Sequence, residues 1–403
     1  MRKLSFVFII AVLLILFGCK KQEELSLEEI ELAGTSGIVE LLEKTTYRPW
    51  EGQSFGAGKS GGTWNDSTLS DPKTFNVIVA DGDGETKALL NYLTDYLIDY
   101  NYITKEWEPH IATPRIEVNE KAGTMDVFFT LRDDLYWSYY GSDKLIKVTS
   151  DDAIFWYNEI EGEEKLYLSA YTGQFLGMED GTIKHIDIEK IDELTYVFHF
   201  PRIIAEPLLH CNGSFGPKHI FKPVKDSEGT EGLKKIFSVS VDPKTIPSMG
   251  QFHLVEYTSG QRLVYKKNPH YWKKDSNGAI IPYPDEIILN IVPDKNTQYL
   301  MFREGSQEDY SPRTEEISEL VAKQEDKYTI YNNGGSNGAA FWTFNQNPIN
   351  KDKPYYEWFT CKEFRQAMSC LLNRERIISQ VYNGLAEPCL YLFPTPNALY
   401  NEN

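Results

Sequence analysis

Cysteine is scarce in this sequence, with 5 residues among 403, and there is neither CxxC spacing nor a nearby pair of histidines. A disulfide-stapled small domain and a zinc site are therefore excluded. Basic residues are also in the minority, because 41 lysines and arginines face 59 acidic residues and leave a formal net charge of −18. Such a chain is not expected to bind nucleic acid without sequence preference. Its 41% hydrophobic content and its length instead suit two or more packed domains.

Motifs of catalysis are missing as well. Gly58-Lys59-Ser60 resembles the end of a phosphate-binding loop, but Gln53 stands where that motif needs glycine, which favours a flexible linker. Asp81–Glu85 resembles the start of a calcium loop, but Thr86 and Tyr92 occupy positions that need glycine and glutamate, which favours a polar turn. HExxH and GxSxG patterns are absent. We therefore expect no enzyme, no metal and no cofactor.

Only one hydrophobic run is long, and it lies at the start. Leu4–Phe17 follows a short basic segment and is shorter than a membrane-spanning helix, which is typical of a signal peptide over residues 1–18. Cys19 comes directly after Gly18 and resembles the lipid-modified cysteine of bacterial lipoproteins. We predict a lipid anchor at Cys19 and a tether over residues 19–61; the alternative is an ordinary secretory signal with an incidental cysteine.

The rest of the chain is predicted to have mixed α and β structure. Hydrophobic residues at helical spacing predict helices over 86–100 and 362–382, the second ended by Asn383-Gly384. Strand-like segments are 125–131, 195–200, 252–257 and 286–292. The pairing of Cys211, Cys361, Cys370 and Cys389 stays open, because connectivity cannot be read from spacing.

Several segments occur in one order along the chain: Phe129–Ser138, Val148–Phe155, Gly216–Ile220, Ser248–Tyr257, Leu263–Trp272, Asp285–Ile288, Pro293-Asp294 and Phe364–Leu385. Upstream of them lie Gly61–Thr63 and Asp71–Asn76. This order resembles the extracellular solute-binding proteins of ABC transporters, in the oligopeptide/dipeptide-binding family (family 5). The resemblance covers roughly residues 61–400.

The resemblance implies an α/β fold of the periplasmic-binding-protein type (class II), with two lobes and a cleft, built from three domains. Domain I is expected at 62–88 and 218–337, domain II at 89–217, and the start of domain III at 338–403. Because family members continue well past the helix at 365–385, we expect the third domain to be incomplete here.

The resemblance also implies a function. We expect a lipoprotein at the outer face of the cell membrane or in the periplasm that captures di- or oligopeptides and delivers them to the permease and ATPase subunits of an ABC importer. Oligosaccharides are the second ligand class, because aromatic residues are abundant. The remaining classes of protein that the sequence leaves open are a truncated remnant, a surface adhesin and a secreted enzyme.

Carried over by alignment, the expected ligand contacts lie on short segments that face the cleft. They are Asn76, Val77, Ile78, Tyr167, Tyr171, Met249, Gly250, Phe341, Trp342 and Asn345. For Ile78, Phe341 and Phe344 a core position is favoured over a ligand contact, and Trp137, Trp156 and Trp272 are interpreted as structural.

Overall fold

The computed structural model describes residues 40–47, 57–101, 104, 106–323, 327–336, 338–391, 393–395, 397 and 400. The chain divides into two compact units, one of residues 51–311 and one of residues 1–50 with 312–403. The predicted signal peptide and Cys19 lie outside the described residues. No helix among the described residues is long and apolar enough to cross a membrane. The domain boundaries drawn from the sequence stay a prediction.

The first sheet of the 51–311 unit has the strand order β13-β14-β15-β2. Its strands are β13 (Phe252–Thr258), β14 (Arg262–Lys267), β15 (Glu286–Ile291) and β2 (Thr63–Thr68). Only the β15–β2 pair is parallel. Gly61 and Gly62 enter β2 with φ of +110° and +85°, which glycine adopts without strain. The strands predicted at 252–257 and 286–292 are confirmed.

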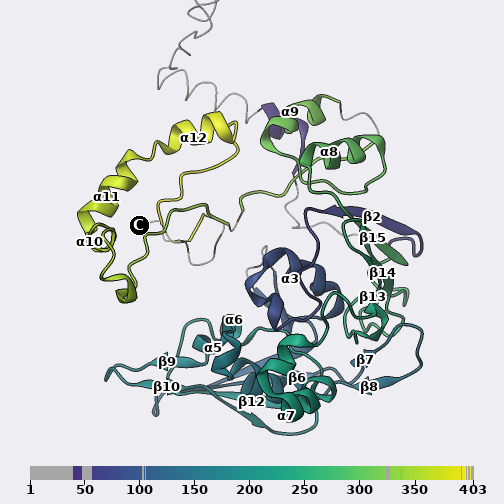
Figure 1. Ribbon diagram of the computed structural model, residues 1–403, viewed down its shortest axis with the longest axis vertical. Coiled ribbons are helices and arrows are strands. Elements are labelled where there is room, and N and C mark those ends of the chain that lie inside the picture. Colours follow the sequence, from purple (N-terminus) through teal and green to yellow (C-terminus); the bar gives the residue numbers. More distant parts are fainter. Residues whose placement is uncertain are drawn as a thin grey trace, which may run out of the picture. The chain divides into compact units, whose positions relative to one another are not determined.

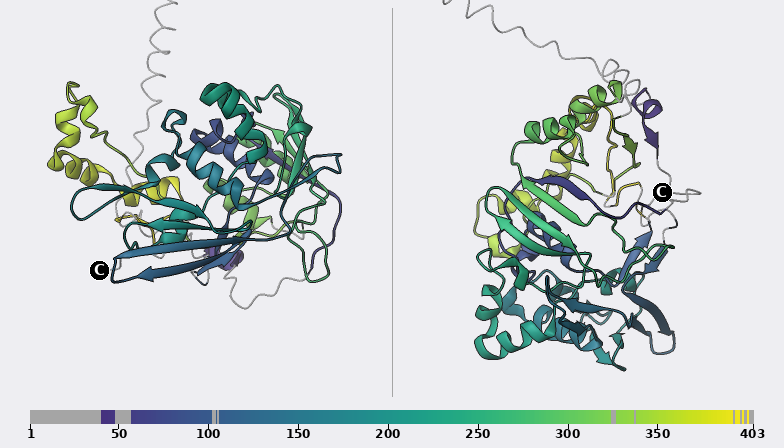
Figure 2. Two further views of the ribbon diagram at one scale, coloured as in Figure 1. Left: turned by 90° about the horizontal axis from the view of Figure 1, so that it is seen from below. Right: turned by 90° about the vertical axis from the view of Figure 1, so that its right-hand side faces the viewer.

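The second sheet is antiparallel, with the order β11-β12-β6-β5. Its strands are β11 (Asp187–Lys190), β12 (Thr195–Phe200), β6 (Thr124–Leu131) and β5 (Ala112–Asn119). Alternate residues of β6 are buried, as expected for a strand with one face on a core. Figures 1 and 2 show the two sheets as separate layers, and in Figure 1 α3 (Gly84–Leu90) lies between them. The strands predicted at 125–131 and 195–200 are confirmed.

Short elements connect and flank the sheets. The helical ones are η1 (Val79–Gly82), η2 (Asn91–Leu93), α4 (Ser150–Phe155), the π-helical η3 (Trp156–Glu161), η4 (Glu164–Leu166), α5 (Ala170–Gly173), α6 (Pro207–Cys211), α7 (Lys218–Lys235), η5 (Pro243–Thr245) and α8 (Lys295–Glu304). The hairpins are β3 (Ile98–Asn101) with β4 (Glu106–Pro109), β7 (Tyr136–Ser138) with β8 (Leu145–Lys147), and β9 (Phe175–Gly177) with β10 (Ile183–His185).

Each sheet has its own hydrophobic core. Phe75, Leu89 and Phe252 belong to the core on the first sheet, and Ile78 and Phe129 to the core on the second. Trp137 and Trp156 are buried in the second core and Trp272 packs against it, so the core positions expected for these tryptophans are confirmed. Val77 and Phe237 pack against both cores and mark where they meet.

The prediction of one helix over 86–100 was wrong beyond residue 93. Thr94 is extended, and the chain continues into β3. The carbonyl of Leu93 accepts hydrogen bonds from the backbone N–H groups of Met249 and Gly250, both at 3.1 Å. That carbonyl is therefore occupied by the 248–250 turn instead of by a further helical turn. The segment 81–85, predicted as a polar turn, joins the end of η1 to the start of α3, and Asp83 between them caps α3 by accepting from the N–H of Thr86 at 2.9 Å.

The unit of residues 1–50 and 312–403 is mainly helical in its described part. Its elements are β1 (Thr46–Tyr47), α9 (Thr314–Ala322), β16 (Tyr331–Asn332), η6 (Pro348–Asn350), α10 (Tyr356–Thr360), α11 (Lys362–Leu371) and α12 (Arg374–Val381), and β1 pairs with β16 in parallel.

The prediction of one helix over 362–382 was also wrong, because the segment breaks between α11 and α12. Leu372 is extended, and the Asn373 side chain caps α12 by accepting from the N–H of Arg376 at 2.9 Å. An asparagine favours such a cap over a mid-helix position. The expected stop is confirmed, since Asn383 and Gly384 have φ of +48° and +81°.

Candidate functional site

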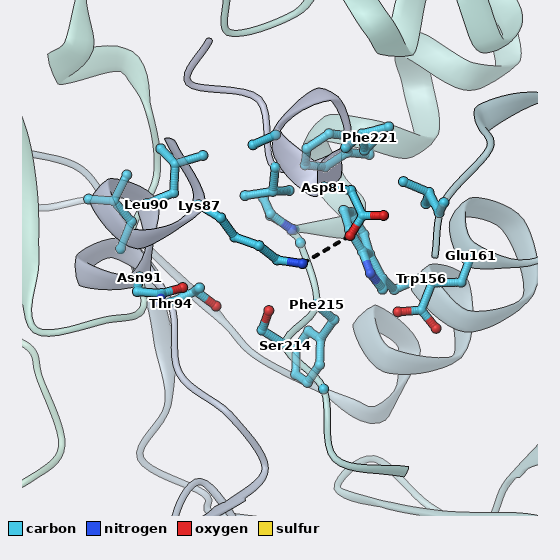
Figure 3. Close-up of a pocket in the computed structure, with 18 of the residues that line it drawn as sticks. Asp81, Lys87, Leu90, Asn91, Thr94, Trp156, Glu161, Ser214, Phe215 and Phe221 are labelled. Carbon is cyan, nitrogen blue, oxygen red and sulfur yellow. Dashed lines mark hydrogen bonds and ion pairs between the residues drawn. The ribbon is translucent and has the colours of Figure 1, made fainter. Parts of the chain in front are cut away.

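A cavity of about 250 Å³ lies inside the 51–311 unit, where the two cores meet (Figure 3). Its walls come from residues within 75–81, 87–96, 156–170, 212–221 and 237–247, together with Trp137. Segments far apart in sequence therefore converge on one space, which is the usual setting of a small-molecule site.

The segment 75–78 crosses from one core to the other along this cavity. Phe75 packs in the first core and Ile78 in the second, with Val77 against both. Asn76 is fully buried and holds the crossing in place: its amide donates to the carbonyls of Leu233, at 2.6 Å, and of Ile236, at 3.0 Å. Its side-chain oxygen accepts from the N–H of Ile78 at 2.9 Å.

An aromatic wall depends on a glycine. The rings of Trp156 and Phe221 meet edge to face, with centroids 5.2 Å apart. A Cβ atom on Gly216 would lie 2.5 Å from the Trp156 ring and 2.9 Å from the Phe221 ring. Only glycine therefore lets the 213–217 segment approach this pair closely.

Asp81 is a charged residue of the cavity wall whose carboxylate has several hydrogen-bonding partners. It accepts from the backbone N–H of Ser169 at 2.7 Å and from its hydroxyl at 3.1 Å, and it pairs with the Lys87 ammonium at 2.9 Å (Figure 3). Burial alone would raise the pKa of Asp81, but the hydrogen bonds from Ser169 and Lys87 outweigh it and lower that pKa. Asp81 is therefore an anion over the physiological range.

Glu161 is the second carboxylate of the wall, and its state is different. Burial raises the pKa of Glu161 to about 7, the Trp156 side chain opposes this shift by hydrogen bonding, and the negative charge of Asp81 adds to it. At neutral pH this carboxyl group is poised between its two forms, so a charged ligand would shift it readily.

The structure brings only part of the predicted contact set to this cavity. Val77 and Ile78 line it, and Asn76 lies directly behind them. Met249 is buried in the second core. A Cβ atom on Gly250 would lie 2.5 Å from the backbone nitrogen of Thr94, so Gly250 serves the close packing of two backbones.

The aromatic residues predicted to cover a ligand lie outside the lining. Tyr167 is 84% exposed, and Tyr171 is half-buried against Phe175. Their neighbours Leu168, Ser169 and Ala170 do line the cavity. Phe341, Trp342 and Asn345 belong to the other compact unit and are exposed there. The alternative of a core position for Phe341 is therefore wrong, since it is 75% exposed.

Sequence reasoning misses the charged groups of the cavity. The sequence indicates Asp81 only as part of a turn and Trp156 only as core, and no motif marks Lys87 or Glu161. One local signal exists, because Gly162 directly follows Glu161 and would permit a tight helix end. Among the described residues, Cys211, Cys361, Cys370 and Cys389 are free thiols, and no group of three metal-binding side chains is present.

The chain is similar to proteins of known families. Residues 106–403 match the model of the bacterial extracellular solute-binding proteins, family 5 Middle. A probable ABC transporter-binding protein of Deinococcus radiodurans is 30% identical over 84% of this chain and 56% of its own length. The chain thus spans about half the length of the curated relatives that it matches.

Solved structures share the fold. An ABC transporter-associated periplasmic binding protein from Helicobacter pylori, in complex with the peptide STSA, has a TM-score of 0.60 and 19% identity, over 86% of this chain and 63% of its own. A periplasmic binding protein from Agrobacterium fabrum, in complex with stachyose, also has a TM-score of 0.60, with 21% identity over 81% of this chain and 50% of its own. The predicted α/β fold of the periplasmic-binding-protein type is confirmed.

Proposed function

The chain belongs to family 5 of the bacterial extracellular solute-binding proteins, and from this membership and its cavity we propose that it captures short peptides outside the cytoplasmic membrane. It then delivers them unaltered to the permease and ATPase subunits of an ABC importer. Cys19 carries the lipid that keeps it at the membrane. We expect no nucleic-acid partner, because 59 acidic residues against 41 basic ones give a net negative charge that repels phosphate groups.

The observation that carries the proposal is the make-up of the cavity. Apolar and aromatic side chains supply most of its walls, and a few charged groups, Asp81, Lys87 and Glu161, lie among them (Figure 3). A peptide needs both kinds of surface, because its side chains are mostly apolar and its ends and basic or acidic side chains are charged. The peptide bound to the Helicobacter pylori neighbour supports this ligand class.

Oligosaccharides are a second candidate, favoured by one observation. Tyr96 and Trp156 line the cavity, and aromatic rings of this kind can stack on sugars. The stachyose bound to the Agrobacterium fabrum neighbour supports this class.

Calorimetric titration of the full chain with di-, tri- and tetrapeptides and with stachyose tests the proposal. We expect saturable binding of peptides with a stoichiometry near one, and mass spectrometry should recover each peptide intact. Saturable binding of stachyose but of no peptide would mean that the ligand is an oligosaccharide. Steady cleavage of the peptides would mean that the protein is an enzyme and not a binding protein.

A cavity-filling variant ties the binding to the cavity. Ala170→Trp places a large ring in the lining and should abolish peptide binding. Ala122→Trp is the matched control, because Ala122 is exposed in the β5–β6 turn, outside the lining. Circular dichroism establishes that both variants fold. Equal peptide affinity in both would place the binding site elsewhere.

The lipid anchor has its own test. Cys19→Ser should abolish labelling by a radioactive fatty acid and release the protein from the membrane fraction. Unchanged labelling of the variant would contradict the prediction of a lipid anchor at Cys19.

A further inference from the structure

Glu161 differs from the other carboxylate of the cavity in what surrounds it. Asp81 accepts from the N–H and hydroxyl of Ser169 and pairs with Lys87. Within the described part of the chain, no lysine, arginine or histidine forms an ion pair with Glu161. The Trp156 side chain is the hydrogen-bonding group that favours its charged form. A half-buried carboxylate that faces a cavity without a cation partner is costly, so this position favours a cation from outside.

A local widening of the helix brings Glu161 and Trp156 to the cavity together. Residues five apart in a regular α-helix point about 140° away from one another. Here the N–H of Gly162 donates to the carbonyl of Tyr157 at 2.9 Å, which is the longer hydrogen bond of a π-helical turn. The wider turn rotates Glu161 back toward the side of Trp156, and both line the cavity (Figure 3).

Glycine at position 162 supports this turn. A Cβ atom there would lie 2.6 Å from the carbonyl oxygen of Asn158, a distance that no side chain tolerates. The turn is therefore specified by the sequence, and π-helical turns of this kind occur frequently at functional sites.

The other ionisable groups near Glu161 leave its charge uncompensated. Tyr157 of the same turn and Tyr196 of β12 have pKa values raised chiefly by burial, so both are neutral at neutral pH. Of the charged groups that the structure describes, Asp81 of η1 and Lys87 of α3 are the ones that act on Glu161; they have opposite sign and pair with each other.

We propose that Glu161 forms a cation subsite in this cavity, and that the ligand presents an ammonium or guanidinium group to it beside the ring of Trp156. The ring adds a cation–π attraction to the charge-assisted hydrogen bond. Where the ligand is a peptide, the inference rests on the proposed function. The subsite would then favour peptides with a basic side chain or a free amino terminus.

A set of matched peptides measures the preference. The full chain is titrated with Ala-Lys-Ala, with the same peptide carrying norleucine for lysine, and with N-acetylated Ala-Lys-Ala. We expect loss of the positive group that occupies the subsite to weaken binding by about tenfold or more. Weaker binding of the norleucine peptide would show that the lysine side chain occupies the subsite. Weaker binding of the acetylated peptide would show that the amino terminus occupies it. Equal affinity for all three peptides would overturn the inference.

The variant Glu161→Gln should remove this preference while retaining the fold. Glu159→Gln is the matched control on the same turn, because Glu159 pairs with Lys222 and Lys225 and is absent from the lining. The preference should persist in Glu159→Gln. A preference that survives in Glu161→Gln would overturn the assignment.

The pH dependence gives a second readout. Because the pKa of Glu161 is about 7, the preference for a lysine side chain should be largest near about pH 8 and shrink toward about pH 6. A preference for the amino terminus should instead peak between these values, because the α-amino group itself loses its proton near about pH 8. In both cases cation binding near pH 7 should release a proton from Glu161. Glu161→Gln should lose both effects. A pH-independent preference in the unmodified chain would count against the subsite.

A probe without a peptide backbone separates this inference from the proposed function. The full chain is titrated with n-butylammonium and with 1-butanol, monitored by tryptophan fluorescence. Saturable binding of n-butylammonium alone, lost in Glu161→Gln, would support the subsite even if no peptide bound. No difference between the two probes would overturn the subsite even if peptides bound.

Discussion

Asp81 joins two distant parts of the chain by accepting both hydrogen bonds that Ser169 can donate, from its N–H at 2.7 Å and from its hydroxyl at 3.1 Å. Asp81 lies in η1, which follows the crossing segment 75–78, and Ser169 lies directly before α5. Both residues line the cavity. This contact therefore fixes the width of the cavity at one side without involving either hydrophobic core.

Breaking this contact should loosen the cavity wall. We expect Asp81→Ala to lower the free energy of unfolding by about 1–3 kcal/mol, because it removes an ion pair and leaves the N–H of Ser169 without its acceptor. Ser169→Ala should cost less, since the backbone donor remains. Urea unfolding of both variants measures the difference. Equal losses would mean that the hydroxyl, and not the backbone bond, carries the contact.

A substitution at Gly216 should disturb the aromatic wall. A Cβ atom there would meet the rings of Trp156 and Phe221 at 2.5 and 2.9 Å, so Gly216→Ala must displace one of them. We expect a loss of about 1–3 kcal/mol in stability and a shift in tryptophan emission. Gly213→Ala is the matched control in the same wall, because no atom of the described residues lies within 4 Å of its added Cβ. Equal effects of the two substitutions would contradict this packing.

His253 should make stability depend on acid. It is 2% exposed, and burial lowers its pKa from 6.5 to about 4. Between these values the unfolded chain binds a proton that the folded chain does not, so the free energy of unfolding should fall as the pH is lowered from about 6.5 to about 4. The full effect is about 3 kcal/mol. His253→Gln should reduce this slope in urea unfolding at several pH values.

His199 provides the control of opposite sign. Burial alone would lower its pKa, but hydrogen bonds to Asp126 and Glu189 outweigh this and raise it. His199 therefore adds stability at low pH that is lost as the pH rises through its folded pKa. The pH-dependent part of this contribution lies above about pH 6.5, whereas that of His253 lies below it. His199→Gln should therefore remove a loss of stability as the pH rises above about 6.5 and leave the slope between about pH 4 and about 6.5 unchanged. If His199→Gln reduces the acid slope as His253→Gln does, the assignment of the titrating group is wrong.

The sequence predicted the sheets better than the helices, for physical reasons. The strands at 125–131 and 195–200 carry large apolar side chains that only a buried face accommodates, so local pattern and tertiary packing agree. The helix expected at 86–100 ends early because the carbonyl of Leu93 is taken by Met249 and Gly250, more than 150 residues away. Periodicity carries no information about such a partner.

The cavity was predictable only in part. Val77 and Ile78 came from the family resemblance, which assigned the segment after the first strand to the cleft, and both line the cavity. The sequence alone could not predict that Asp81 and Glu161 line the cavity. Their proximity depends on the contact of Asp81 with Ser169 and on the π-helical turn that ends at Glu161, and neither leaves a periodic signal in the sequence.

Hydrogen–deuterium exchange of the full chain, with and without a saturating short peptide, tests the central claim most directly. A ligand in the cavity should slow exchange in the segments 77–96, 156–170 and 212–217, which line it from both cores. The turn at 119–123, which lies outside the lining, should exchange at an unchanged rate. Saturable peptide binding with no protection in the three lining segments would contradict the account.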